Sequence, residues 1–329
     1  MAVRDGMPYL RETLAALDAQ TAPSALVVAE DGSTDETPDV LRAYAARRTP
    51  PQPVTILETG GVGLAAARNR ALATVTAPYT LILDADDLIA PTLTARSVDL
   101  AAARDDLDLV YPLFDHMDEA GRLLGVRSRT PRGPLTPAGI LTANPIHSDS
   151  GVLVRTEALR RAGGFDEALP GCVGLDAWRR VVSLRAGNSA CLPEPLVRYR
   201  RSAGQITADA GRMAQSFARV LAKADDTLSA AERARVIAAQ HLYFASLAYE
   251  QGAAREARRH TLAAWRAAPR SLAMKPYAYA RAAISMASLA PAPVHDGLKR
   301  LALAARSARA RRDVQADGYG VVAASHRTR

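Results

Sequence analysis

Short apolar runs alternate with segments of helical spacing along the first two thirds of the chain. The apolar runs, each short enough for a buried strand, lie at 26–29, 54–57 and 81–83. Apolar residues three or four apart mark the predicted helices at 8–20, 34–44, 64–73 and 91–104. Strands that alternate with helices favour a mostly parallel sheet with helices on both faces. The pattern therefore predicts an α/β fold with a mostly parallel central sheet flanked by helices.

Further along, strand-like and helical segments continue, but with longer connections. We predict strands or extended chain at 107–112, 151–155 and 193–199, and helices at 157–162 and 176–184. Residues 131–145 are rich in Pro, Thr and Gly and are expected to form a loop of the kind that often covers active sites. This region completes a first domain over 1–207.

The pattern changes after residue 208, where Gly and Pro become rare and helical spacing dominates. Residues 240–269 contain two amphipathic runs around Gln251-Gly252, which predicts a helical hairpin. Further helices are expected at 271–290 and 294–312. The chain is thus divided into a domain at 1–207, a helical C-terminal region at 208–312 and a disordered tail at 313–329.

Charge and composition narrow the classes of partner. The net charge is +8, and residues 208–329 hold 20 Lys and Arg against 9 Asp and Glu, so the basic excess belongs to the C-terminal region. Aromatic residues do not alternate with the basic ones, which argues against a nucleic acid partner. We see no signal peptide and no membrane-spanning run, and two cysteines indicate no disulfide framework. We expect a cytoplasmic protein. The C-terminal helices could contact the inner membrane face peripherally or form a homodimer, and the sequence leaves these alternatives open.

An acidic cluster follows the third of these apolar runs. Asp84, Asp86 and Asp87 fall within four residues, at the carboxyl end of the predicted strand. Ligands bind at this end of the strands in open α/β sheets. Like charges this close need solvent, a partner Arg or a hard divalent cation. A solvated acidic turn before a helix is the alternative.

The other predicted strands also end in polar or glycine-rich segments. The strand predicted at 26–29 ends in Glu30-Asp31-Gly32-Ser33-Thr34-Asp35, where a turn and a helix start could receive the polar groups of a nucleotide. The strand predicted at 54–57 leads to Gly60-Gly61-Val62-Gly63, and the next helix carries Arg68 and Asn69. Each segment alone is a weak signal, since Asp31 could only start a turn and Arg68 could be a surface residue.

Together, these motifs resemble a family 2 glycosyltransferase with the GT-A fold. The resemblance covers residues 1 to about 207. It rests on six segments in family order and spacing, namely Met1 to Gly6, Glu30 to Asp35, Gly61 to Asn69, Leu83 to Asp87, Gly163 to Glu167, and Tyr199-Arg200.

The resemblance implies roles for particular residues. The implied nucleotide-binding residues are Val3, Asp5, Asp31, Arg68, Asn69, Asp84, Ala85 and Asp86. Asp86 and Asp87 are implied to hold Mg²⁺ or Mn²⁺ at the donor's diphosphate, and Asp176 corresponds to the catalytic base. The implied substrates are a nucleotide-sugar donor, with UDP favoured, and a sugar, lipid-linked or small-molecule hydroxyl acceptor.

This assignment is chemically coherent. A metal held by carboxylates neutralises the leaving diphosphate, and a positioned carboxylate takes the proton of the acceptor hydroxyl. One base and one metal suit a single displacement with inversion. Three features depart from the family pattern: the first strand is short at Met1, Leu175 precedes Asp176 in place of an acid, and Ser202 replaces a histidine.

Two other functions compete with this one. The strand followed by Asp84-Ala85-Asp86 loosely resembles a phosphatase of the haloacid dehalogenase type. A non-catalytic scaffold that uses the helical C-terminal region as an interaction surface is the second. Asp176 itself could be a helix N-cap, because it opens a helical run.

Overall fold

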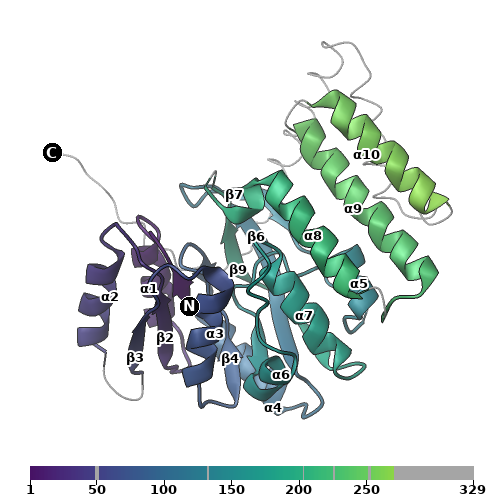
Figure 1. Ribbon diagram of the computed structural model, residues 1–329. Helices are drawn as coiled ribbons and strands as arrows, with labels where there is room; N and C mark the ends of the chain where they lie inside the picture. The colour runs from purple at the N-terminus through teal and green to yellow at the C-terminus, as the bar shows by residue number, and fades with distance from the viewer. Residues whose placement is uncertain (49–51, 132, 203, 225–226, 251–252, 270–329) are drawn as a thin grey trace.

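The structure is a computed structural model that describes residues 1–48, 52–131, 133–202, 204–224, 227–250 and 253–269. The helices predicted at 271–290 and 294–312 and the tail at 313–329 lie outside the described residues. Figure 1 shows the sheet that contains β2 (Leu26–Glu30) and β3 (Val54–Glu58), with its helices, at one end of the molecule and a helical hairpin at the other.

The first half of the chain alternates strands and helices as the apolar pattern predicts. Strands β1 (Ala2–Val3), β2 (Leu26–Glu30) and β3 (Val54–Glu58) form a parallel sheet in that order. The connecting helices are α1 (Leu10–Asp18), α2 (Thr37–Ala46) and α3 (Leu64–Thr74).

Small residues let α3 approach this sheet closely. Ala67 and Ala71 lie one turn apart on α3 and pack against Ala2 of β1 and Ala29 of β2. Arg68 is the next residue along the helix after Ala67 and is also buried. The close packing therefore carries a guanidinium to the ends of the strands.

The second sheet has six strands among the described residues. Its order is β4-β8-β6-β9-β5, with β7 paired to β6. The bounds are β4 (Tyr79–Leu81), β5 (Leu88–Ile89), β6 (Leu109–Met117), β7 (Leu123–Arg127), β8 (Leu153–Arg155) and β9 (Ser189–Arg200). All nine residues of β6 are buried, as befits the strand that pairs with three others. The β6–β9 pair is parallel, whereas the other pairs are antiparallel. The predicted α/β fold is confirmed, with the parallel order concentrated in the first sheet.

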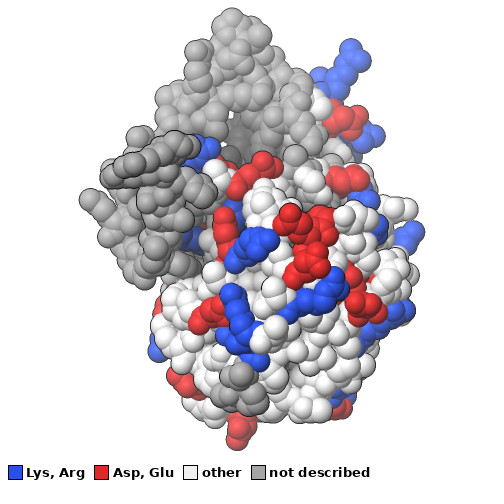
Figure 2. All heavy atoms as spheres, turned by 90° about the vertical axis from the view of Figure 1, so that its left-hand side faces the viewer, with Lys and Arg blue, Asp and Glu red and all other residues white. Residues whose placement is uncertain are grey.

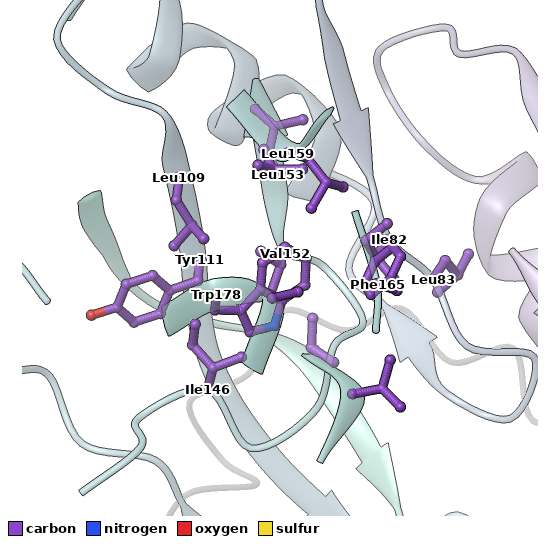
Figure 3. Close-up of a cluster of buried hydrophobic side chains, with 14 of the residues drawn as sticks. Ile82, Leu83, Leu109, Tyr111, Ile146, Val152, Leu153, Leu159, Phe165 and Trp178 are labelled. Atoms are coloured by element: carbon purple, nitrogen blue, oxygen red, sulfur yellow. The ribbon is translucent and has the colours of Figure 1, made fainter. Parts of the chain in front are cut away.

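The main core is one cluster of buried residues that extends from α1, β2 and α2 into the second sheet and the helices of the chain's middle. These helices are α4 (Leu93–Ala102), α5 (Pro137–Thr142), α6 (Thr156–Arg161) and α7 (Val173–Ser183). Trp178 of α7 is wholly buried and meets the Phe165 ring edge-on, with the ring centroids 6.0 Å apart (Figure 3). Ile82 and Leu83, which directly precede the acidic cluster, join the same core. The packing thus fixes the strand end from which the acids project.

Three longer helices follow β9 and the short 3₁₀ turn at Ile206–Ala208: α8 (Ala210–Ala224), α9 (Ala230–Glu250) and α10 (Ala254–Ala267). The α9 and α10 helices pack together through Ala238, Leu242, Ala264 and Ala268, and flank residues 251–252 as the spacing predicts. Among the described residues, no helix combines the length and the hydropathy needed to cross a bilayer.

Apolar contacts and ion pairs together dock α8 on the main core. Phe217, Val220 and Ala224 belong to the core cluster. Lys223 lies 2.7 Å from an Asp166 carboxylate oxygen and 2.8 Å from Asp176 Oδ2. Asp176 is therefore tied to α8 as well as to its own helix, where Arg179 and Arg180 lie 3.2 and 2.8 Å from its oxygens.

Gly151 is a position where only glycine fits. Its φ is +78°, and an added Cβ would lie 2.5 Å from Val197 Cγ2 and 3.2 Å from Leu93 Cδ2. We expect Gly151→Ala to lower the free energy of unfolding by about 2–4 kcal/mol, the sum of left-handed backbone strain and overpacking. Urea denaturation measures the loss.

Gly121 is the matched control, because its φ is +79° and nothing lies within 4 Å of an added Cβ. Gly121→Ala should cost only the backbone strain, about 1–2 kcal/mol. Equal losses of unfolding free energy in the two variants would show that the close contact with Val197 does not exclude a Cβ at position 151.

The ion pairs of Asp176 predict a second stability effect. Asp176→Asn would leave three cations around a buried amide, and breaking such a network costs about 3–5 kcal/mol. Asp166→Asn is the control, because Asp166 is partly exposed and has one ion-pair partner, Lys223, in common with Asp176. This variant should lower the free energy of unfolding by about 0–1 kcal/mol.

This difference should depend on pH. Burial alone would raise the pKa of Asp176, but Lys223 and Arg180 hold that pKa below its usual value. A depressed folded-state pKa adds stability above the unfolded value of about 3.9 and loses it as pH falls through the folded value. The denaturation midpoints of the wild type and of Asp176→Asn should converge below about pH 4. A difference between the two midpoints that stays constant at lower pH would contradict the ionised network.

Candidate active site

The acidic cluster lies in the turn between β4 and β5, at the carboxyl end of β4. Asp84, Asp86 and Asp87 differ in burial and in partners, although they are close in sequence. The backbone N–H of Asp84 donates to Ser150 Oγ, at 3.0 Å, which ties the turn to the loop that precedes β8. The three acids therefore have separate tasks.

Arg68 connects two acids that come from different parts of the chain. Its two terminal nitrogens lie 2.6 Å from Asp84 Oδ1 and 2.6 Å from Asp149 Oδ2. Its guanidinium also lies over the Phe165 ring, 5.2 Å from the centroid. Burial alone would lower the pKa of Arg68, but the charges of Asp84 and Asp149 raise it. Arg68 is a fixed cation that holds Asp84 and Asp149 on either side.

Asp84 remains partly accessible despite this pairing, with 28% of its side chain exposed. Burial raises the pKa of Asp84, and the neighbouring Asp149 adds to the rise while Arg68 opposes it. Two carboxylates share a single guanidinium here, so the pair keeps an excess of negative charge that a cation would relieve.

Asp87 is a structural carboxylate. It is wholly buried; its Oδ2 accepts hydrogen bonds from Ser148 Oγ and Ser150 Oγ, and its Oδ1 accepts one from the backbone N–H of Arg200. Burial raises the pKa of Asp87 well above its usual value. Both oxygens are engaged away from solvent, and the role of metal ligand stays a prediction for Asp87.

Arg200 fastens the turn from the other side. Its Nε donates to the Asp86 carbonyl oxygen at 2.8 Å, and one terminal nitrogen lies 2.7 Å from Glu12 Oε2. The guanidinium lies 4.4 Å from the centre of the Tyr9 ring. The Tyr199-Arg200 motif thus orients the acidic turn through the backbone and leaves the Asp86 carboxylate free to serve another purpose.

Gln205 is a site residue that the sequence did not indicate. Its Nε2 donates to Asp86 Oδ2 at 2.9 Å and to the Arg200 carbonyl oxygen. Ser202, which departs from the family pattern, donates its backbone N–H to Gln205 Oε1 at 3.3 Å. A side chain three residues after Ser202 thus reaches the Asp86 carboxylate. No periodic signal marks such a loop residue.

The residues at the ends of β1 and β2 form a second group. Asp31 is buried, and its carboxylate accepts hydrogen bonds from Thr59 Oγ1 and from the backbone N–H groups of Gly61, Val62 and Gly63. Although burial opposes it, these hydrogen bonds lower the pKa of Asp31. The carboxylate therefore shapes the glycine-rich loop, and its contact with a nucleotide stays a prediction.

Val3, Asp5 and Ala85 lie next to this group. The Val3 carbonyl accepts the N–H of Asp31 at 2.8 Å, and Asp5 Oδ1 accepts the N–H of Thr34 at 2.7 Å. The Ala85 carbonyl accepts a hydrogen bond from Thr13 Oγ1 at 2.9 Å. The ends of β1 and β2 are thus linked by hydrogen bonds, whereas the segment after β4 is tied to α1 through Thr13.

Asn69 has a purely structural set of contacts. Its Nδ2 donates to the Phe165 carbonyl and to Glu167 Oε1, and its Oδ1 accepts the Phe165 N–H. A Cβ at Gly164 would lie 2.6 Å from that oxygen. Asn69 clamps the Gly163 to Glu167 turn, and its role in nucleotide binding stays a prediction.

Asp176 lies away from the acidic cluster. None of its side chain is exposed, and its partners are Arg179, Arg180 and Lys223. A general base must come within hydrogen-bond reach of the proton that it removes. The role of catalytic base stays a prediction for Asp176, whose carboxylate is enclosed by these three cations. The α7 residue that does touch the cluster is Trp178, whose Nε1 donates to Asp149 Oδ1 at 2.9 Å.

The described residues could bind a metal ion only if the substrate supplied some of its ligands. Nowhere among them do three His, Cys, Asp or Glu side chains gather as a ligand set. Asp86 offers one half-buried carboxylate, with the Gln205 amide beside it. Mg²⁺ is commonly held by one or two carboxylates together with substrate phosphates, and Mn²⁺ favours similar oxygen ligands. The donor set fits an ion shared with a diphosphate.

Three kinds of comparison place the chain among known proteins. The family model described as "Glycosyl transferase family 2" matches residues 2–163. Among curated relatives, the uncharacterized glycosyltransferase YibD of Escherichia coli (strain K12) is 32% identical over 84 residues, 26% of this chain and 23% of YibD. The uncharacterized protein Rv1520 of Mycobacterium tuberculosis is 26% identical over 202 residues, 60% of this chain and 56% of the relative. The match thus spans about half or less of the length of each of these relatives.

Solved structures with the same fold include two transferases. The crystal structure of S. aureus TarS 1–349 in complex with UDP-GlcNAc has a TM-score of 0.57 at 19% identity, and covers 87% of each chain. The mannosyltransferase PcManGT from Pyrobaculum calidifontis, in complex with GDP-Man and Mn²⁺, has a TM-score of 0.55 at 21% identity, over 95% of this chain and 86% of that one. Identities this low show the fold alone. The family match and the shared architecture agree, and the chain belongs to glycosyl transferase family 2, with the GT-A fold.

Proposed function

We propose that this protein transfers a sugar from a nucleoside diphosphate donor to a hydroxyl acceptor, with inversion at the anomeric carbon. The observation that carries the proposal is the acid cluster at the end of β4, in which Arg68 positions Asp84 beside Asp86. Solved structures of the same fold hold UDP-GlcNAc, UDP, or GDP-Man with Mn²⁺, which supports a nucleotide-sugar donor.

The donor's nucleotide would lie along the ends of β1, β2 and β4. In this proposal Val3, Asp5, Asp84 and Ala85 line its site, and Asp86 lies at the diphosphate. Arg68, Asp31 and Asn69 act indirectly, since Arg68 orients Asp84, Asp31 shapes the 60–63 loop and Asn69 holds the turn after α6.

Asp86, with Gln205 beside it, would hold Mg²⁺ or Mn²⁺ together with the diphosphate. The bound ion supplies charge neutralisation for the leaving diphosphate. The protein's part is to fix Asp86, which it does through the Arg200 contact to the Asp86 carbonyl. Inversion is proposed because single displacement requires only one deprotonating group on the acceptor side.

The competing functions differ in what they would bind. A haloacid dehalogenase-type phosphatase is set aside, because the family match and the GT-A fold account for the strand and the acids. A scaffold without catalysis would bind no nucleotide. The acceptor is proposed only as a hydroxyl compound, and contact with a membrane or a second copy through the C-terminal helices remains a prediction.

Nucleotide binding provides the test. Purified protein should be stabilised by UDP or GDP only when Mn²⁺ is present, by about 2.7 kcal/mol at a ligand concentration one hundred times Kd. Asp86→Asn should remove the Mn²⁺-dependent part, because it removes the carboxylate proposed to hold the ion. Thermal unfolding with each nucleotide, with and without Mn²⁺, measures the effect.

Asp39→Asn is the matched control, because Asp39 is an exposed acid of α2, paired only to Arg42. It should respond to nucleotide and Mn²⁺ as the wild type does. If no nucleoside diphosphate stabilises the wild type, or if Asp86→Asn responds fully, the proposed function fails.

A further inference from the structure

We propose that Asp149, in the loop before β8, is the carboxylate that removes the acceptor's proton. The inference rests on the proposed function and names the group that the transfer requires. It would replace Asp176, the acid that the sequence favoured.

The contacts of Asp149 place it beside the donor acids. Its Oδ2 lies 2.6 Å from Arg68 Nη1, and the other terminal nitrogen of that guanidinium lies 2.6 Å from Asp84 Oδ1. Its Oδ1 accepts the indole N–H of Trp178 at 2.9 Å. Two buried and rigid partners thus fix one carboxylate next to the acid that ends β4.

Exposure separates Asp149 from Asp176. The side chain of Asp149 is 20% exposed, whereas that of Asp176 is 0% exposed. Asp176 is ringed by Arg179, Arg180 and Lys223, and a substrate could reach it only if α7 and α8 parted. Asp149 is the acid that an acceptor can approach without rearranging the fold.

The start of α7 is shaped around Asp149. Gly174 is the second residue of that helix, and a Cβ added there would overlap the Asp149 carboxylate. The carboxylate therefore packs against the first turn of α7, where the helix dipole favours negative charge. Glycine at 174 leaves space for a side chain supplied by another loop.

His147 is the other proton acceptor in this loop, and its surroundings disfavour it. Its Nδ1 lies 2.9 Å from His116 Nε2. Burial lowers the pKa of His147 to about 4, and the charge of Arg201 adds to the effect. A neutral imidazole paired with a second buried imidazole is poorly placed to take up a proton.

The proposed step balances as follows. The acceptor hydroxyl oxygen forms a bond to the anomeric carbon, and its proton passes to an oxygen of Asp149. The bond from that carbon to the diphosphate oxygen breaks, and the diphosphate leaves with the electron pair. Asp149 later returns its proton to solvent. When no acceptor is bound, water can take the same part, and the donor is hydrolysed.

Asp149→Asn is the decisive variant, because the amide keeps the size of the side chain and can still accept from Trp178. The assay follows release of nucleoside diphosphate from UDP-GlcNAc or GDP-Man with Mn²⁺, with water as acceptor. A positioned base contributes about 10²–10⁴-fold, so kcat/KM should fall at least about 100-fold while Kd for the nucleotide changes little.

Asp176→Asn is the comparison, assayed per folded molecule at a temperature at which it is folded. It should retain release within about tenfold of the wild type, because general-base loss costs far more than that. Transfer by Asp149→Asn near the wild-type rate overturns the inference. So does a weakened nucleotide Kd with kcat unchanged, because this marks a role confined to positioning Arg68.

A transplanted carboxylate gives a second, independent variant. Asp149→Gly combined with Gly174→Asp supplies the acid from α7 at nearly the same place, and should release at least about tenfold more nucleotide than Asp149→Gly alone. A folded, nucleotide-binding double variant with no such gain overturns the inference. A wild type that releases nucleotide from neither donor overturns the proposed function itself, and this result is read first.

Discussion

The site depends on one buried cation, Arg68, shared by two carboxylates. A guanidinium taken out of water is costly unless paired charges and hydrogen bonds compensate it. Asp84 and Asp149 supply that compensation at 2.6 Å each. The pairing therefore forces the end of β4, the loop before β8 and helix α3 to meet at one point. Removing the Arg68 charge would leave two carboxylates side by side with no cation between them.

The remaining contacts of the acidic turn keep this arrangement rigid. Asp87 ties the turn to Ser148 and Ser150, and Arg200 holds it from β9. Neither residue needs to touch a substrate. They keep Asp86 and Asp84 directed outward from a core in which Ile82 and Leu83 are buried (Figure 3). By contrast, the surface shown in Figure 2 has acidic and basic side chains interspersed over its coloured part.

Much of the fold could be predicted because it depends on local pattern. The apolar runs and helical spacing located the parallel strands and the helices between them, and the acids after β4 marked the correct strand end. The mixed second sheet could not be predicted, because strand direction there depends on long-range pairing such as β6 with β9. Helix α5 escaped notice within a Pro-rich segment, although Thr136 caps it through the Gly139 N–H.

The roles of individual acids were harder to predict because partners distant in sequence decide them. Asp87 and Asp176 are acids in suggestive positions, yet the residues that enclose them come from β9, α8 and the loop before β8. Asp149 and Gln205 lie in loops, where no periodicity marks a functional side chain. The family motifs pointed to the region of the candidate site. The contacts of each acid in three dimensions are needed to propose its role.

The most direct test is a crystal structure of the protein with UDP and Mn²⁺, with the anomalous signal of manganese measured. The account predicts a manganese peak at Asp86 beside the diphosphate, with Arg68 still bridging Asp84 and Asp149. A peak at Asp87, or a structure in which Asp149 has left Arg68 and Asp176 faces the diphosphate, would contradict it.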